Sequence, residues 1–199
     1  MSVSHVIHTR QEQDEDGRDY VPQDIVDFLK HRAAISKELK KSGVSSGSIT
    51  KITEYILKTP ATILFFALAA SNLSVDIVHF HDLGFSDRDL PIERHDVAGD
   101  AIRRLQSGRQ VQCEEVLPST WLPINRNTFL MNQWLFMAPV FTNETFSHVL
   151  HKKCPIPFST AVNATRPKTG LSGSVREIHL HRAHLKGFPE VNTILIELY

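Results

Sequence analysis

Apolar side chains recur at helical spacing along residues 22–42. They approximate one stripe, with Pro22 near its start and Gly43 just past its end, positions that these two residues favour at helix boundaries. The pattern predicts one amphipathic helix. Basic side chains lie on its other face, which we interpret as a solvated helix face, with a basic contact surface as the alternative. The stripe consists of Ile25, Phe28, Leu29, Ala33, Ile35 and Leu39.

The stretch of small residues at 42–48 is typical of a linker. Ser48 or Thr50 is placed to cap the helix that follows. Helical spacing then continues to about Ala70. Pro60 is expected to divide this stretch, because proline removes a hydrogen bond inside a helix and clashes with the preceding turn.

The most apolar run of the chain is ATILFFALAA at residues 61–70. It is about half as long as the roughly 20 residues that a membrane-spanning helix needs, so it predicts the buried helix of a soluble core. A turn at 84–91 follows, with Ser86 or Asp87 as the cap of a short helical turn. Residues 21–92 are therefore expected to form a helical domain of about three to five helices, better suited to protein contacts than to chemistry.

The regions that flank this domain have other patterns. Residues 1–20 are acidic and polar, and we expect a disordered tail because they bury too little apolar surface to offset the entropy of ordering. Residues 93–150 predict an irregular, aromatic-rich connector, in which 96–105 favours a short helix. Trp121 is expected to dock against a neighbouring element. The aromatic side chains that follow, beginning with Trp134, indicate core or domain packing, with a ligand site as the alternative.

Segments with the pattern of strands lie near the carboxyl end. Residues 175–180 and the apolar run at 193–198 predict two strands joined by a polar turn. The predicted fold class is α+β, with a helical N-terminal domain followed by two or three short antiparallel strands within 151–199. Residues 160–199 are expected to pack on the helical part or else to be poorly ordered, since an incomplete sheet leaves a face and an edge uncovered.

Composition narrows the class of protein. Of 199 residues, 41% are hydrophobic, which supports a core, and 22 basic residues balance 22 acidic ones. A net charge of zero gives no bulk attraction to nucleic acid or to an acidic membrane, so neither is expected as a partner. Cys113 and Cys154 are too few for a disulfide framework and lack metal-ligand spacing, and the amino terminus has no secretory leader. We therefore expect a cytoplasmic or nuclear protein.

Two groups of histidines are candidate metal ligands. Those within 179–184 have no cysteine pair or carboxylate at a matching spacing, so no metal site is expected there. His79 and His81 are interpreted as part of a solvated helix end.

A glycine pattern near the carboxyl end carries the candidate chemistry. Gly170, Gly173 and Val175 have the spacing of the second half of G-x-G-x-x-G-x-V, a loop whose backbone N–H groups approach phosphates. Lys168 stands at the first glycine position. A strand, a turn and a second strand follow, which is the order in a protein-kinase nucleotide lobe. We therefore name Gly170, Gly173 and Val175 as candidate cofactor-binding residues, with a simple hairpin turn as the alternative.

Other segments extend this resemblance. The sequences NQWLFMAPVF at 132–141, HVLHKKCPIPF at 148–158 and IHLHRAH at 178–184 resemble a family of fungal protein-kinase-like proteins, as do residues 75–92. Those proteins carry a helical segment, a tryptophan-containing connector and then a kinase domain. The resemblance covers roughly residues 20–199, and it implies that 151–199 form a partial kinase-like N-lobe.

The resemblance also implies that catalytic groups are missing. A kinase binds the α- and β-phosphates with a lysine on the second strand, where this chain has Ile196. No catalytic or metal-binding aspartate follows, so we expect no catalytic residues and no cofactor, with ATP and Mg²⁺ as the alternative. We predict a truncated kinase-like protein that acts through contacts with a protein partner. The alternatives are the N-terminal portion of an ATP-binding serine/threonine protein kinase and a non-enzymatic interaction module.

Overall fold

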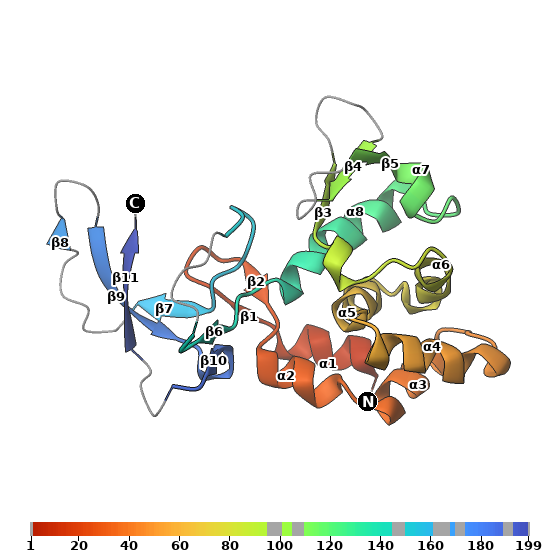
Figure 1. Ribbon diagram of the computed structural model, residues 1–199, viewed down its shortest axis with the longest axis horizontal. Coiled ribbons are helices and arrows are strands. Elements are labelled where there is room, and N and C mark those ends of the chain that lie inside the picture. The colour runs from red at the N-terminus through yellow and green to blue at the C-terminus, as the bar shows by residue number, and fades with distance from the viewer. Residues whose placement is uncertain are drawn as a thin grey trace.

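The fold is α+β, as the sequence predicts. A computed structural model describes residues 2–94, 101–104, 110–144, 150–160, 168–169, 174–188 and 193–198. Helices gather at one end of the molecule, and the carboxyl-terminal strands lie at the other end (Figure 1). The helices are α1 (Val3–Arg10), α2 (Gln23–Leu29), α3 (Arg32–Lys41), α4 (Ser46–Lys58), α5 (Thr62–Ala70), α6 (Ile77–Asp82), α7 (Cys113–Val116) and α8 (Pro123–Asn132).

Helix α5 is the centre of the helical part. It contacts α1, α4, α6 and α8, and every one of its side chains except that of Ile63 is buried. A helix that is apolar on all sides is stable in water only when other elements cover it. The prediction that residues 61–70 form a buried helix is confirmed. Among the described helices none alone is both long and apolar enough to cross a membrane; α4 and α5 meet the length and composition criteria together, with a bend of 117° between them.

The predicted helix breaks are partly confirmed. Pro60 lies between α4 and α5, as expected. The single helix predicted over 22–42 is wrong, because α2 ends at Leu29 and α3 begins at Arg32. His31 causes the division: its backbone is extended, and its Nδ1 accepts the N–H of Ala34 at 3.2 Å, which caps α3.

The caps also differ from those predicted. The residue before α4 is Ser45, not Ser48 or Thr50. Ser86 caps the short 3-10 helix η2 (Asp87–Asp89), as predicted. Asp87 instead caps a helix that is distant in sequence, since its carboxylate accepts the N–H groups of Ile63 at 3.2 Å and Leu64 at 2.8 Å in α5.

The amino-terminal segment is ordered, which corrects the prediction of a disordered tail over residues 1–20. Helix α1 buries Val3, Val6 and Ile7 against the core, and the strands β1 (Glu12–Gln13) and β2 (Asp19–Tyr20) pair in antiparallel fashion. Acidic composition misled the prediction because Asp14 is not a solvated charge. Its carboxylate accepts four hydrogen bonds from the chain.

The predicted irregular connector also contains regular structure. A three-stranded antiparallel sheet is formed by β3 (Ile92–Arg94), β4 (Ala101–Arg104) and β5 (Gln110–Gln112). The short helix predicted over 96–105 is therefore wrong for residues 101–104, where pairing with two neighbouring strands overrides the local preference. Helix α8 was missed as well, although Pro123 at its first turn is a typical helix start.

The carboxyl-terminal strands are antiparallel, as predicted. Strand β9 (Ser174–Leu180) pairs with β11 (Thr193–Leu198) on one side. On its other side it pairs with β7 (Phe158–Thr160) and, at its opposite end, with β8 (Lys168–Thr169). A separate parallel pair joins β6 (Phe141–Thr142) to β10 (Leu185–Lys186). Whether these strands belong to a kinase-like N-lobe stays a prediction.

Part of the carboxyl-terminal region packs on the amino-terminal part. His184 is 1% exposed, at the end of the 3-10 helix η4 (Arg182–His184). Its ring lies edge-on to Tyr20 of β2, with 5.5 Å between the centroids, and its Nδ1 is 3.0 Å from the carbonyl oxygen of Pro139. The expected packing of residues 160–199 on the helical part is confirmed for η4, which contacts α2.

Candidate functional site

The two tryptophans of the connector have opposite surroundings. Trp121 is 5% exposed and packs against Phe80 and Phe129. Its indole N–H donates a hydrogen bond to Asp76 at 2.8 Å, so its one polar atom is satisfied inside the core. The prediction that Trp121 docks against a neighbouring element is confirmed.

Trp134 lies in the 3-10 helix η3 (Gln133–Phe136), directly after α8. Gln133, Leu135 and Phe136 are buried, whereas Trp134 is half-buried. The sequence analysis favoured core packing for this aromatic residue and kept a ligand site as the alternative. The structure makes Trp134 part of a hollow surface, and the ligand site stays a prediction.

The backbone under Trp134 is held by a buried amide. The side chain of Gln133 accepts the N–H of Ile92 at 2.9 Å and donates to the carbonyl oxygen of Ile92 at 2.6 Å. It also donates to the carbonyl oxygen of Leu130 at 3.0 Å, and the carbonyl oxygen of Leu135 accepts the N–H of Val21 at 2.8 Å. These bonds join η3 to β3, α8 and the start of α2, which fixes the position of Trp134 before any ligand arrives.

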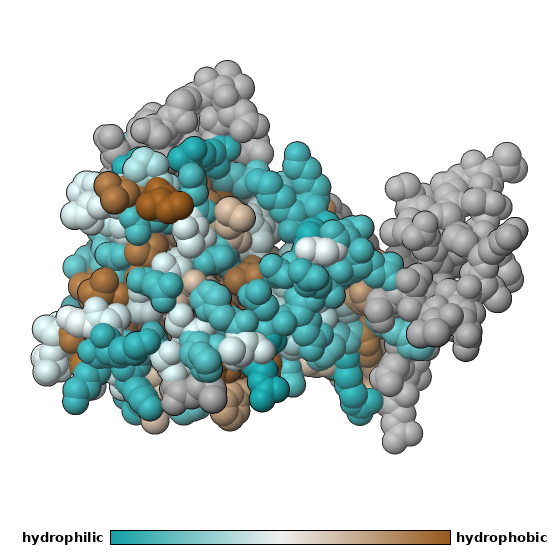
Figure 2. Space-filling model, turned by 180° about the vertical axis from the view of Figure 1, so that it is seen from behind, coloured by the Kyte–Doolittle hydropathy of each residue, from teal (hydrophilic) through white to brown (hydrophobic). Residues whose placement is uncertain are grey.

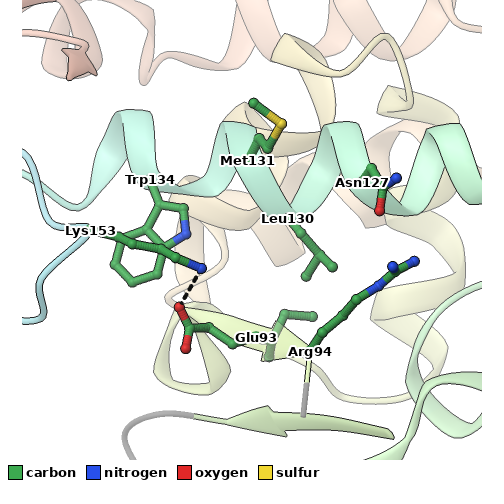
Figure 3. Close-up of a pocket in the computed structure, with 8 residues that line it drawn as sticks. Glu93, Arg94, Asn127, Leu130, Met131, Trp134 and Lys153 are labelled. Carbon is green, nitrogen blue, oxygen red and sulfur yellow. Dashed lines mark ion pairs between the residues drawn. The ribbon is translucent and has the colours of Figure 1, made fainter. Parts of the chain in front are cut away.

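A hollow of about 350 Å³ opens beside Trp134, and we call it the first hollow (Figure 3). Its walls come from β3, from α8 with η3, and from Lys153. Apolar side chains line its middle, and Met131 among them is 72% exposed. The lining residues are Ile92, Glu93, Arg94, Asn127, Leu130, Met131, Trp134 and Lys153.

Charges occupy both ends of the first hollow. At one end Lys153 places its Nζ 2.8 Å from Oε1 of Glu93 and 6.0 Å from the centre of the Trp134 ring (Figure 3). His151 stacks on Trp134 with 5.0 Å between ring centroids, and its Nε2 is 3.7 Å from Oε2 of Glu93. Arg94 and Asn127 lie toward the other end.

A second hollow of about 350 Å³ adjoins the first. The two share Met131, Trp134 and Lys153, so the tryptophan borders both. The second hollow is also lined by Arg18, Asp19, Asn132, Leu135 and Lys152.

The wall of the second hollow is braced by the ordered amino-terminal segment. Asp14 accepts Nε of Arg18 at 2.9 Å and the backbone N–H of Ile156 at 3.0 Å. Arg18 in turn donates from Nη1 to the carbonyl oxygen of Lys152 at 2.9 Å. Residues 152–156 are thus attached to the turn at Asp14, and Lys152 and Lys153 are held beside Trp134.

The structure describes Val175 of the candidate nucleotide loop but not its two glycines. Gly170 and Gly173 lie outside the described residues. Lys168 of β8 pairs with Val175 of β9, so the described residues on either side of them belong to neighbouring antiparallel strands. Ile196, at the predicted lysine position, pairs with Arg176. The nucleotide loop at Gly170, Gly173 and Val175 therefore stays a prediction.

Histidines and cysteine supply no metal or nucleophile in the described parts of the chain. No group of three or more metal-ligating side chains occurs among the residues that the structure describes. His79 lies 3.1 Å from the carbonyl oxygen of Val116, and His81 pairs with its neighbour Asp82 at 2.7 Å. Burial raises the pKa of the Cys154 thiol to about 11, so it stays protonated and donates to the carbonyl oxygen of Met137 at 3.0 Å.

Comparison with models of protein families gave no match, and neither did comparison with curated proteins or with solved structures.

The sequence analysis missed most of this site. Glu93 and Arg94 lie on β3, which was not predicted from the sequence. Lys153 lies beside Trp134 because its segment is hydrogen-bonded to the turn at Asp14, a contact between residues far apart in sequence. One feature of the sequence could have indicated the site: Met131 and Trp134 lie near each other, and a basic run follows at 151–153.

Proposed function

We propose that this chain is a kinase-like protein that acts through contact with a protein partner, and that the contact site is the pair of hollows beside Trp134. The observation that carries the proposal is the position of Trp134. It stands on a frame of buried residues, yet its ring borders two hollows. Tryptophan on a fixed backbone beside a concave apolar surface is typical of residues that dominate the energy of protein interfaces.

A binding role fits the chemistry of the site better than catalysis. Glu93 faces Lys153 and His151, so its negative charge is already compensated, and the buried thiol of Cys154 is protonated. Phosphoryl transfer needs positioned charges around the phosphates, and Ile196 supplies none where a kinase has its lysine. We place the partner in the cytoplasm or nucleus and expect neither nucleic acid nor a membrane to bind at this site.

The proposal can be tested with short random peptides displayed on phage and selected against the full chain. Peptides should be enriched whose binding is lost when Trp134→Ala or Met131→Ala is introduced. The matched control is Ile124→Ala, because Ile124 is 66% exposed on the same helix as Met131 and lines neither hollow. Enriched peptides that bind the Trp134→Ala and Met131→Ala variants as well as the natural chain would refute this function.

The second candidate function is nucleotide binding by a partial kinase-like N-lobe. The observation that favours it is the antiparallel order of β8, β9 and β11 around residues 170–173. Calorimetry with Mg-ATP tests it, with Ile196→Lys as a gain-of-function variant and bulky replacements of Gly170 and Gly173 as loss-of-function variants. We expect no binding by the natural chain. Binding that disappears with the bulky replacements would instead support the nucleotide function.

A further inference from the structure

We infer that the ligand of the two hollows is an extended acidic peptide segment, with carboxylates at its ends and an apolar side chain between them. This inference rests on the proposed function and specifies the partner's chemistry. Cations without ion pairs, an apolar surface and the adjoining position of the two hollows support it.

Each hollow contains a cation that forms no ion pair with the residues that the structure describes. In the first hollow, Glu93 is matched by Lys153 and His151. No ion pair joins Arg94 to any residue that the structure describes. A guanidinium binds a carboxylate through two parallel hydrogen bonds, and the amide of Asn127 lies on the same side of the hollow.

The second hollow repeats this arrangement. Asp19 accepts a hydrogen bond from Nε2 of Gln13 at 2.9 Å, and Arg18 is paired with Asp14 and Asp16. The ammonium group of Lys152 forms no ion pair within the described part of the chain. Among the described residues, one cation without an ion pair therefore stands in each hollow, Arg94 in the first and Lys152 in the second. The second hollow also holds the carboxylate of Asp19, whose hydrogen-bond partner is the neutral amide of Gln13.

The surface between these cations is apolar apart from the ion pair of Lys153 with Glu93. Leu130, Met131 and Trp134 line it, and Met131 is largely exposed. Free phosphate or another small anion would occupy one end and leave this surface uncovered. An apolar side chain placed here would bury surface at the ring of Trp134, which is where binding energy concentrates in protein interfaces.

The shape favours an extended chain. A single ligand that fills both hollows must pass Trp134, because the hollows meet at Met131, Trp134 and Lys153. An extended peptide sends alternate side chains to the same side, so acidic, apolar and acidic residues at alternate positions match the two cations and the surface between them. Nucleic acid fits less well, since the chain has no net positive charge and the centre of the site is apolar.

The test uses the displayed peptides whose binding depends on Trp134. Each is synthesised with a fluorescent label, once unchanged and once with Asp and Glu replaced by Asn and Gln, and its affinity for the full chain is measured by anisotropy. The acidic form should bind about tenfold more tightly than the amide form. Arg94→Gln and Lys152→Gln should each remove part of that difference, whereas Lys51→Gln, which removes an exposed cation outside both hollows, should not.

The other outcomes separate the two proposals. Trp134-dependent peptides that bind equally well in acidic and amide forms would overturn the acidic ligand and leave the contact function standing. A selection without Trp134-dependent peptides would overturn both. A single-stranded DNA oligonucleotide that displaces the peptides and loses affinity with Arg94→Gln would overturn the peptide in favour of a nucleic-acid ligand.

Discussion

Trp121 precedes helix α8 and Trp134 follows it, yet the molecule uses the two rings differently. Trp121 is enclosed by Phe80 and Phe129 and donates its N–H to Asp76. Trp134 has buried residues on both sides in sequence but keeps its own ring at the surface. The comparison shows that two tryptophans next to the same helix can differ in role, one as part of the core and the other as part of the surface.

The surface around the helical part makes the contrast clearer. Apolar groups on the face seen from behind are scattered among hydrophilic ones (Figure 2). Single exposed apolar side chains are ordinary on a folded protein and need no functional explanation. Met131 differs from the other exposed ones in bordering both hollows. The large apolar side chains that are exposed are Phe28, Val75, Leu83, Leu122, Ile124 and Met131.

The largest expected effect is on stability at Trp121. Trp121→Ala should lower the free energy of unfolding by about 3–5 kcal/mol, because it leaves a cavity and an unpaired Asp76 carboxylate. Trp134→Ala should lower it by only about 1 kcal/mol, since the ring is partly in water. Urea unfolding of the two variants measures the difference. Equal losses of unfolding free energy in the two variants would contradict the distinction between a buried Trp121 and a partly exposed Trp134.

The next effect concerns the turn that braces Lys152 and Lys153. Asp14→Ala removes a carboxylate that is 1% exposed and accepts four hydrogen bonds, and it should cost about 2 kcal/mol. Tryptic cleavage after Lys152 and Lys153 should become faster. Asp16→Ala is the matched control, because that side chain is 71% exposed. Unchanged cleavage in the Asp14→Ala protein would show that the turn does not hold this segment.

A smaller effect depends on pH. Burial lowers the pKa of His184, and Nε2 of His184 has no hydrogen-bond partner among the described residues. The unfolded chain therefore takes up the proton more readily, so stability is complete above a pH of about 6.5 and falls as the pH drops below it, by at most about 1.4 kcal/mol per pH unit. Unfolding measured at several pH values should show this loss in the natural chain.

The variant His184→Gln isolates this contribution. Glutamine does not titrate, so the loss of stability on acidification should shrink. His5→Gln, at an exposed position of α1, is the control and should leave the loss unchanged. An identical pH profile for the natural chain and His184→Gln would contradict the role given to His184.

The smallest effect on stability is expected at Met131. Met131→Ala and Ile124→Ala each remove an exposed side chain of α8 and should change the free energy of unfolding by less than about 0.5 kcal/mol. Only Met131→Ala should weaken Trp134-dependent peptides. A loss of binding in both variants would mean that the effect comes from the helix as a whole.

The sequence predicted elements whose signals are local. A helix as apolar as the run at 61–70 is stable in water only when it is buried. Pro60 favours a helix break, because proline removes a hydrogen bond inside a helix and clashes with the preceding turn. Trp121 was also predicted to dock, because a large ring among prolines and asparagines needs a partner. These predictions needed no knowledge of distant contacts.

The parts that the sequence did not predict depend on distant contacts. Asp14 looked like one acidic residue among several, and its bond to the distant N–H of Ile156 is one of the contacts that make residues 1–20 part of the fold. The break at His31 depends on a ring nitrogen acting as a cap, for which composition gives no signal. The site at Trp134 combines β3, α8 and residues 151–153, and the strand was not predicted.

The most direct test of the central claim uses the two indole N–H signals in the NMR spectrum of nitrogen-labelled protein. The chain has 2 tryptophans, so each signal can be assigned with one Trp→Phe variant. When a Trp134-dependent acidic peptide is titrated into the full chain, the signal of Trp134 should shift with peptide concentration while that of Trp121 stays in place. A shift of Trp121 alone, or of neither signal despite binding, would contradict the claim that the hollows beside Trp134 form the contact site.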